Sequence, residues 1–228
     1  MEEYPHTSKG RSRPFLDVTH PEIRRYLREL HEHEVGVFGE MEEFARQINY
    51  PILDSLSGHL ISILAWMSRF SSVYEMGSGF GYSASWFARG MNGKGRVTVT
   101  DISEVYIEMA KKNLRTLYPS LDVRTVVGDA IDHLRHDSEV HDCIFIDIGD
   151  KMLYPEAGRV AIERLSDGGV LIADNVLWRG KVVEPEPDEQ TRSIRRFNEE
   201  LMSRTDMDSI LLPVGDGLLI STRKRPLD

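Results

Sequence analysis

Cysteine is almost absent from this sequence, since Cys143 is the only one among 228 residues. A single cysteine excludes an intramolecular disulfide and a metal site built from several thiolates of one chain. Any metal must therefore use oxygen or imidazole ligands. Long apolar runs are missing too, and even Leu60–Met67 is far too short to cross a bilayer. Because Met1–Pro5 does not resemble a signal peptide, we expect a soluble, cytoplasmic protein with no membrane-spanning segment.

Basic residues are also fewer than acidic ones. The 28 Lys and Arg side chains are outnumbered by 37 Asp and Glu side chains, which gives a formal net charge of −9. Such a chain repels a polyphosphate backbone unless a local basic patch intervenes. A small-molecule substrate is therefore favoured over a nucleic acid.

The chain length suits one large domain, residues 1–228, with a well-buried core. Residues 1–14 show no periodicity and predict a mobile arm. Thr19 and Glu22 have the spacing of a capping box, and apolar residues at helical spacing follow, so residues 15–70 predict a helical layer that ends with a helix at His59–Arg69. Residues 71–228 show a different pattern and form the expected core.

In that core, short β-rich runs alternate with amphipathic segments. The runs are Val73–Met76, Arg96–Thr100, Val123–Val127, Cys143–Asp147 and Gly169–Ala173. This alternation predicts an α/β fold, a Rossmann-like, doubly wound, mostly parallel sheet with helices on both faces. Two further runs, Ile210–Val214 and Leu218–Thr222, are joined by a turn at Gly215–Gly217 that forces antiparallel pairing. The sheet is therefore expected to close on a C-terminal antiparallel hairpin.

A glycine-rich loop follows the first expected strand. In Glu75-Met76-Gly77-Ser78-Gly79-Phe80-Gly81 the glycines let the backbone turn sharply and approach a ligand, although an ordinary tight turn is the alternative interpretation of the loop alone. The spacing Gly-x-Gly-x-Gly and the carboxylate of Glu75 favour a cationic adenosyl cofactor over a dinucleotide. A carboxylate repels a pyrophosphate and attracts a sulfonium that carries an α-amino group. The loop therefore predicts a site for S-adenosylmethionine.

Two more acidic residues end strands at the same edge. Asp101 ends the second expected strand, where a carboxylate accepts hydrogen bonds from ribose hydroxyls. A helix cap is its alternative role, although Ser103 can supply that cap. Asp129 ends the third strand in Gly128-Asp129-Ala130, a position suited to an adenine amino group. Together with the glycine loop, these residues predict one crevice at the carboxyl edge of the sheet.

Oxygen ligands gather at the next two strand ends. Asp147 ends the fourth expected strand, and Asp174 and Asn175 end the fifth. Two carboxylates and an amide suit Mg²⁺ or a similar divalent cation such as Mn²⁺ or Ca²⁺, whereas zinc normally takes more nitrogen or sulfur. The alternative is that Asp174 and Asn175 only satisfy backbone groups of a turn. Lys151 lies just beyond Asp147 and is a candidate general base if the adjacent metal charge lowers its pKa. Without that context, the alternative interpretation of Lys151 is a solvated surface lysine.

Four stretches carry a resemblance to a known family. They are Glu75–Ser83, Ile144–Asp147, Gly168–Val182 and Leu211–Leu218, of which the part Asp-Asn-Val-Leu-Trp-Arg-Gly-Lys-Val at 174–182 is the most specific. On these residues the chain, from about Leu53 to Ser221, resembles the caffeoyl-CoA and catechol O-methyltransferase family of class I methyltransferases.

This resemblance implies a seven-stranded sheet with a reversed last strand and S-adenosylmethionine-dependent methylation of a small catechol-like or vicinal-diol acceptor. Homodimers are common in the family, and the N-terminal helices offer an interface. A divalent metal is implied at Asp147, Asp174 and Asn175, with Lys151 and Asp147 as catalytic residues. The expected cofactor residues are Glu75, Gly77, Ser83, Asp101, Asp129, Ala130 and Asp147.

The chain departs from the family pattern at one point. Family members usually place a lysine three residues after the first metal aspartate, but Asp147-Ile148-Gly149-Asp150-Lys151 places it four residues after. Gly149 can absorb the extra residue as a bulge or tight turn that still delivers Lys151. If it does not, the base is lost or replaced.

Three other functions stay open at this stage. Methylation of a hydroxylated tRNA base would use the basic arm Lys9, Arg11 and Arg13 to contact phosphates, against the acidic balance of the chain. A non-catalytic cofactor-binding protein would keep the fold without the reaction, and only the displaced lysine supports it. An NAD-dependent dehydrogenase is disfavoured by Glu75 and the glycine spacing. Trp178 is interpreted either as a wall of the acceptor pocket or as a core residue.

Overall fold

The structure is a computed structural model that describes residues 21–31 and 36–224. The expected arm at residues 1–14, its basic residues and Thr19 lie outside the described residues. The division of the chain into arm, helical layer and core stays a prediction.

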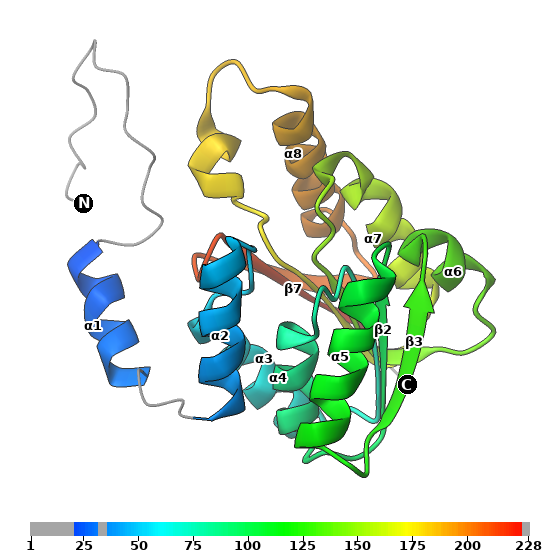
Figure 1. The fold of residues 1–228 in the computed structure, drawn as a ribbon. Helices are drawn as coiled ribbons and strands as arrows, with labels where there is room; N and C mark the ends of the chain where they lie inside the picture. Colours follow the sequence, from blue (N-terminus) through cyan, green and yellow to red (C-terminus); the bar gives the residue numbers. More distant parts are fainter. Residues whose placement is uncertain (1–20, 32–35, 225–228) are drawn as a thin grey trace.

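Within the described residues, seven strands form one sheet (Figure 1). The strands are β1 (Ser72–Met76), β2 (Arg96–Asp101), β3 (Asp122–Val127), β4 (His141–Ile146), β5 (Leu165–Ala173), β6 (Met207–Leu212) and β7 (Leu218–Arg223). Their order is β3-β2-β1-β4-β5-β7-β6. Strands β1 to β5 pair in parallel, and β7 runs antiparallel to both β5 and β6. The predicted α/β fold, with its reversed last strand and C-terminal hairpin, is confirmed.

Helices connect these strands and precede them. They are α1 (Pro21–His31), α2 (Val37–Ile48), α3 (Ser55–Ser68), α4 (Tyr82–Gly90), α5 (Glu104–Leu117), α6 (Ala130–His136), α7 (Tyr154–Glu163) and α8 (Glu189–Met202), with 3₁₀ helices η1 (Lys151–Leu153) and η2 (Trp178–Val183). Side-chain caps fix several of the starts. Ser103 Oγ accepts a hydrogen bond from the Tyr106 N–H at the start of α5.

Several boundaries differ from the sequence prediction. Strand β5 begins at Leu165, four residues before the predicted Gly169, and β4 spans His141–Ile146 where Cys143–Asp147 was predicted. Helix α3 begins at Ser55 and not at His59, because the Asp54 carboxylate accepts a hydrogen bond from the Leu56 N–H and caps an earlier turn. Strand β6 ends at Leu212 and not at Val214. Pro213 has no N–H for a sheet ladder, so the chain leaves the strand there.

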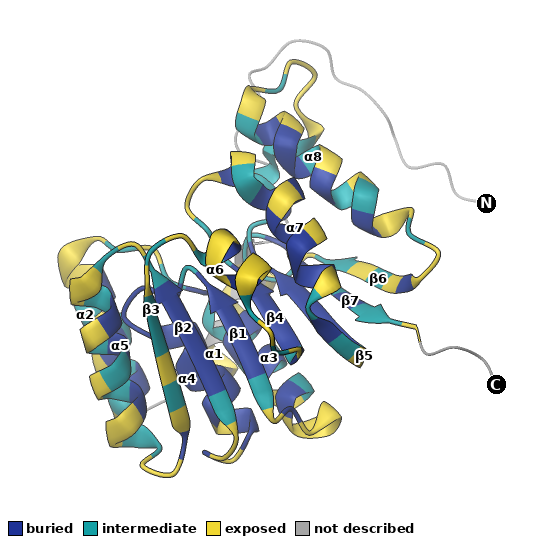
Figure 2. Cartoon of the chain, turned by 90° about the vertical axis from the view of Figure 1, so that its right-hand side faces the viewer, coloured by how far each residue is buried: buried dark blue, intermediate teal, exposed yellow. Residues whose placement is uncertain are grey.

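Helices cover both faces of the sheet, and the parallel strands β1, β2, β4 and β5 between them are largely buried, whereas β3 at the sheet edge is partly exposed (Figure 2). Side chains alternate between two cores. Val73 packs with α2 to α5 on one face, and its neighbour Tyr74 packs with α6 to α8 on the other. Because both faces of β1, β2 and β4 are buried, polar side chains of these strands reach solvent mainly at the strand ends. The carboxyl ends of β1, β2, β4 and β5 therefore hold the groups available for chemistry.

The N-terminal helices expose large apolar side chains. Ile63, Trp66 and Met67 on α3 are 54%, 65% and 72% exposed, and Ile23 and Tyr26 on α1 are exposed as well. No helix within residues 21–31 or 36–224 combines the length and apolar character needed to cross a bilayer.

Candidate active site

The glycine loop turns the end of β1 into α4. Gly77, Gly79 and Gly81 have φ angles of 87°, 49° and 88°, a region that side chains disfavour. The requirement is strictest at Gly77, where a Cβ atom would lie 2.4 Å from the carbonyl oxygen of Asp147. The predicted cofactor loop therefore packs directly against the end of β4, which carries the first predicted metal ligand.

Two hydroxyl residues that the sequence analysis missed tie this loop to β2. The N–H groups of Gly77 and Ser78 donate to the carbonyl oxygen of Thr100 at 3.2 and 2.8 Å. In return the Thr100 N–H donates to Ser78 Oγ at 3.0 Å, and Thr100 Oγ1 donates to the carbonyl oxygen of Glu75 at 2.7 Å. These hydrogen bonds hold the loop in one shape, which lowers the entropic cost of binding a ligand there.

Glu75 lies beneath the loop and is fully buried. The Ser83 hydroxyl, from the first turn of α4, donates to Glu75 Oε1, so the structure brings these two predicted cofactor residues together. Oε2 is buried and has no hydrogen-bond partner among the described residues. Burial raises the pKa of Glu75 to about 7, although the hydrogen bond from Ser83 and the nearby Ser78 hydroxyl act in the opposite direction. A buried carboxylate with an unused oxygen is costly unless a cationic group pairs with it.

The other strand-end acids also have structural roles. Asp101 Oδ2 accepts from the Gly79 N–H at 3.1 Å, and its Oδ1 accepts from the Ser103 N–H at 2.8 Å. Asp129 caps α6, because its Oδ1 accepts from the N–H groups of Ile131 and Asp132 at 2.8 and 3.0 Å. Their contacts with a cofactor, and those of Ala130, stay predictions.

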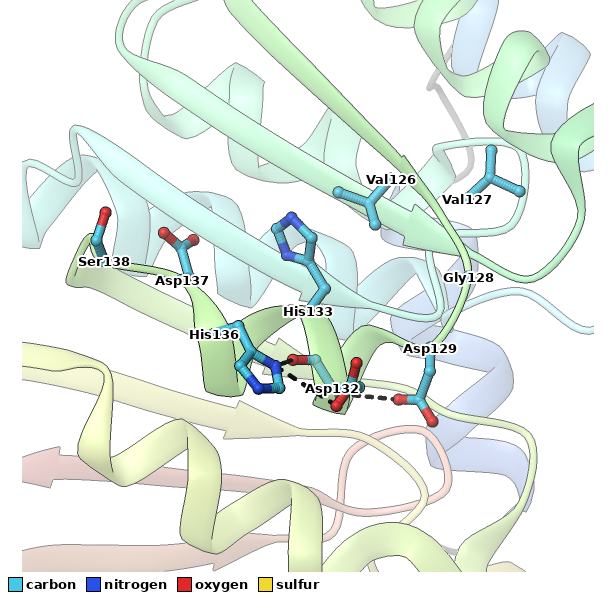
Figure 3. Close-up of a pocket in the computed structure, with 9 residues that line it drawn as sticks. All are labelled: Val126, Val127, Gly128, Asp129, Asp132, His133, His136, Asp137 and Ser138. Carbon is cyan, nitrogen blue, oxygen red and sulfur yellow. Dashed lines mark hydrogen bonds and ion pairs between the residues drawn. The ribbon is translucent and has the colours of Figure 1, made fainter.

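A cavity of about 540 Å³ lies between the end of β3 and α6 (Figure 3). Among the predicted site residues only Asp129 lines it, together with His133, His136, Asp132 and Asp137. Across the described residues, no group of three or more His, Cys, Asp or Glu side chains is arranged to hold a metal. The predicted metal donors Asp147, Asp174 and Asn175, which are two carboxylates and an amide, do not line this cavity.

These donors meet where β4 and β5 end. The N–H of Asp147 donates to the Met76 carbonyl oxygen, and that of Asp174 donates to the Ile146 carbonyl oxygen, both at 3.0 Å. Asn175 adopts φ 59°, a left-handed conformation that asparagine tolerates. Its Nδ2 donates to Asp174 Oδ2 at 3.0 Å. Asp174 Oδ1 is buried without a hydrogen-bond partner in the described part of the chain.

Lys151 reaches this cluster although it stands one position later than in the family pattern. Its Nζ donates to Asn175 Oδ1 at 2.7 Å, to the Ile148 carbonyl oxygen at 2.6 Å and to Tyr154 Oη at 2.8 Å. It lies 4.0 Å from Asp147 Oδ1, and the Lys151 side chain is only 3% exposed. The extra residue lies in the loop before η1, the 3₁₀ helix that starts at Lys151. Lys151 is therefore a buried residue and not the solvated lysine that the sequence alone allowed.

Burial and the neighbouring charges shift the pKa values of Asp147, Lys151 and Asp174. Burial raises the pKa of Asp174 well above its ordinary value, and the neighbouring Asp147 carboxylate raises it further. Burial also raises the pKa of Asp147, against the effect of Lys151. Burial lowers the pKa of Lys151, although Asp147 and Asp174 oppose this. Asp174 is buried and Asp147 is partly buried. A cation between two such adjacent carboxylates stabilises them, and the ammonium of Lys151 supplies part of that charge.

Two residues near the cluster were missed by the sequence analysis. Tyr154 is fully buried and its hydroxyl donates to the Asp174 carbonyl oxygen at 3.0 Å. Asp216, in the turn before β7, accepts from the Arg179 N–H and acts electrostatically on the cluster. The sequence held one signal for each residue. Tyr154 follows Lys151 by three positions, and Asp216 stands between Gly215 and Gly217.

Trp178 has features of both roles that the sequence allowed, a wall of the acceptor pocket and a core residue. Its ring packs at the margin of the core on the α7 and α8 side and is only partly buried. The Nζ atoms of Lys151 and Lys181 lie 5.5 and 5.6 Å from its centre. The ring therefore borders the cluster.

A doubly wound sheet with a glycine loop, a buried carboxylate beneath the loop and a lysine–carboxylate cluster one strand away defines a group-transfer enzyme of the Rossmann-like methyltransferase class. The profile of the O-methyltransferase family matches residues 31–224. The chain belongs to this O-methyltransferase family, which confirms the resemblance and the assignment as an enzyme.

Individual relatives agree with this assignment. The catechol O-methyltransferase of Niastella koreensis is 31% identical over 160 residues, which cover 68% of this chain and 72% of the relative. The structure of an O-methyltransferase from Bacillus cereus in complex with SAH has a TM-score of 0.76 and 27% identity, covering 89% of this chain and 97% of that one. The O-methyltransferase TomG of Streptomyces achromogenes, solved in complex with SAM, has a TM-score of 0.74 and 26% identity, with 89% and 96% covered.

Proposed function

We propose that this O-methyltransferase takes its methyl group from S-adenosylmethionine and transfers it to a hydroxyl of a small catechol-like or vicinal-diol acceptor. We further propose that a divalent cation, Mg²⁺ or a related ion such as Mn²⁺ or Ca²⁺, binds at Asp147, Asp174 and Asn175. One observation carries the proposal. Asp147, Asp174, Asn175 and Lys151 meet beside the glycine loop, with the Asp147 backbone packed against Gly77.

The cofactor assignment is supported by Glu75. Its buried, unpartnered Oε2 matches the positive charge of S-adenosylmethionine, because a cation that enters this site offsets the cost of the buried carboxylate. The Bacillus cereus relative solved with SAH supports the same choice. Gly77, Ser83, Asp101, Asp129, Ala130 and Asp147 are the proposed further contacts.

The cluster fits a hard divalent cation. Its donors are carboxylate and amide oxygens, which such ions prefer, and the buried Oδ1 of Asp174 lacks any other partner among the described residues. When bound, a divalent cation acidifies a coordinated hydroxyl and holds two adjacent oxygens of the acceptor in one orientation.

The chain's own residues supply the rest of the reaction. Burial lowers the pKa of Lys151, which favours loss of its proton, and a neutral Lys151 would take the acceptor's hydroxyl proton. The acceptor oxygen then forms a bond to the methyl carbon, the carbon–sulfur bond breaks, and the electron pair stays on sulfur in S-adenosylhomocysteine. Trp178 borders this space and provides a wall for an aromatic acceptor.

The test is methyl transfer from labelled S-adenosylmethionine to a panel of catechols, measured with Mg²⁺ and with excess EDTA. We expect turnover with Mg²⁺, none with EDTA, and none in the Asp174→Ala variant. Turnover that persists in EDTA would contradict the metal role of Asp147, Asp174 and Asn175. Tight cofactor binding without turnover on any catechol would favour a tRNA acceptor or a non-catalytic binding protein.

We also propose that the protein forms a homodimer through α1 and α3. These helices contact each other, and both expose large apolar side chains, which are Ile63, Trp66 and Met67 on α3 and Ile23 and Tyr26 on α1. We propose that these side chains form one apolar surface. A second copy of the chain would cover it.

Light scattering tests this assembly. We expect the Trp66→Glu variant to be monomeric under conditions in which the unmodified protein is dimeric, because a charge in the centre of an apolar interface loses its hydration. Met202→Glu is the control, since Met202 is 50% exposed on α8 and outside this surface. A monomeric unmodified protein, or a dimer that survives the Trp66 substitution, would refute the proposed interface.

A further inference from the structure

Lys151 and the proposed metal require the same oxygen. Asn175 Oδ1 accepts a hydrogen bond from Lys151 Nζ at 2.7 Å, and it is also the only amide oxygen of the proposed metal set. The amide has only this one oxygen, and the hydrogen bond from its Nδ2 to Asp174 Oδ2 at 3.0 Å fixes its orientation.

Several contacts hold the Lys151 ammonium in place. Besides Asn175, it donates to the Ile148 carbonyl oxygen and to Tyr154 Oη, and its stem is buried. The aromatic ring of Tyr154 lies 4.6 Å from Nζ. Three hydrogen bonds satisfy all three protons of the ammonium, so Lys151 acts as a fixed cation inside the cluster.

Two cations cannot share this space without strong repulsion. Like charges a few ångströms apart in a buried site repel each other far more than they would in water. The carboxylates of Asp147 and Asp174 favour either cation, since each offsets their own repulsion. The ammonium and a divalent ion are therefore alternatives for the same negative site.

We propose that Lys151 and the divalent cation compete for Asn175 Oδ1, so that cation binding releases the ammonium from Asn175. Without the cation, Lys151 holds the ends of β4 and β5 together. With it, the Lys151 side chain leaves Asn175 Oδ1, and this link between the end of β5 and the loop after β4 is broken. This inference rests on the metal site of the proposed function.

The first experiment is titration of MgCl₂ into the unmodified full-length chain and into Lys151→Met, followed by calorimetry. Methionine keeps the length of the stem and removes the competing charge, so we expect Kd for Mg²⁺ to fall by about tenfold or more. Lys181→Met is the matched control. Lys181 also lies beside the Trp178 ring but bonds to Asp188 outside the cluster, and we expect its loss to change Kd by less than about twofold.

The second experiment needs no variant and measures acetylation of individual lysines by acetic anhydride, read by peptide mass spectrometry. Saturating Mg²⁺ should increase modification of Lys151, which is 3% exposed, and leave Lys181 unchanged. This readout reports release of the ammonium itself and is independent of the folding of Lys151→Met.

The outcomes separate the two proposals. An unchanged or higher Kd in Lys151→Met, or Lys151 modification that Mg²⁺ does not increase, overturns the competition and leaves the metal-dependent function standing. Absence of Mg²⁺ binding by both the unmodified protein and Lys151→Met overturns the competition together with the metal site on which it rests.

Discussion

A single methyl group added at Gly77 should cost the protein about 3 kcal/mol of unfolding free energy and reduce methyl transfer by about 100-fold or more. In the Gly77→Ala variant the new Cβ atom would lie 2.4 Å from the carbonyl oxygen of Asp147 and 3.0 Å from its carbonyl carbon. Backbone atoms cannot rotate away as a flexible side chain can. The φ of 87° at this position adds backbone strain for any residue with a Cβ.

The functional loss follows from what the displaced backbone carries. Moving the Asp147 carbonyl also moves the Asp147 carboxylate, one of the proposed metal ligands, and separates β1 from β4 at the edge where cofactor and acceptor must meet. Urea denaturation gives the stability change, and initial rates with labelled S-adenosylmethionine give the activity.

Gly149→Ala is the control for this substitution. Gly149 lies two residues after Asp147, and a Cβ there has nothing within 4 Å, so we expect a change in stability within about 0.5 kcal/mol. Equal effects of the two substitutions, or a Gly77→Ala variant that is both stable and active, would show that the close approach of the loop to β4 is not required.

The fold could be read from the sequence because its strands are buried on both faces. Such strands appear as short, nearly continuous apolar runs, and the helices between them appear as amphipathic segments. The errors were local. The start of α3 was missed because the cap at Asp54 precedes the apolar pattern, and β6 was extended through Pro213 because the apolar run continues past the point where backbone pairing stops.

The site could be predicted only where chain position determines spatial position. Parallel strands place their carboxyl ends at one edge, so Glu75, Asp147 and Asp174 could be assigned to one region without knowing any contact. Hydrogen bonds that depend on strand register or on helix packing could not be predicted in this way. The hydrogen bonds between Ser78 and Thr100 depend on the pairing of β1 with β2, and the bond between Tyr154 and Asp174 depends on how α7 packs.

The burial of Glu75 could not be predicted from the sequence either. Because of this burial, we expect the Glu75→Gln substitution to have opposite effects on stability and on cofactor binding. We expect this variant to be more stable than the unmodified protein at pH 8, by about 3 kcal/mol, and to bind S-adenosylmethionine about 100-fold more weakly. The pKa of Glu75 is raised from 4.5 to about 7, first of all by burial. Each pH unit of that difference corresponds to about 1.4 kcal/mol of preference for the neutral form.

The sign of the pH dependence follows from linkage. Between pH 4.5 and about 7 the unfolded chain has lost the proton of Glu75 while the folded chain keeps it. The unmodified protein therefore loses stability as the pH rises through this window, and the loss levels off above pH 7. Glutamine does not titrate, so the stability gap between the variant and the unmodified protein should be small at pH 5 and should grow up to pH 7. Denaturation curves at several pH values measure it, with Glu163→Gln, an exposed carboxylate on α7, as a control that should show no such growth.

Cofactor binding should have the opposite dependence on pH. An ionised Glu75 pairs with the positive charge of S-adenosylmethionine, and below about pH 7 the empty site holds the neutral acid. Kd for the unmodified protein should therefore rise by up to about tenfold for each pH unit below 7, whereas Kd for Glu75→Gln should be high and flat. A variant that binds cofactor as tightly as the unmodified protein would separate Glu75 from the cofactor. A variant that is weaker in binding but also less stable at pH 8 would show that the carboxylate is stabilised by its surroundings in the fold, and that its burial is not a cost maintained for the cofactor.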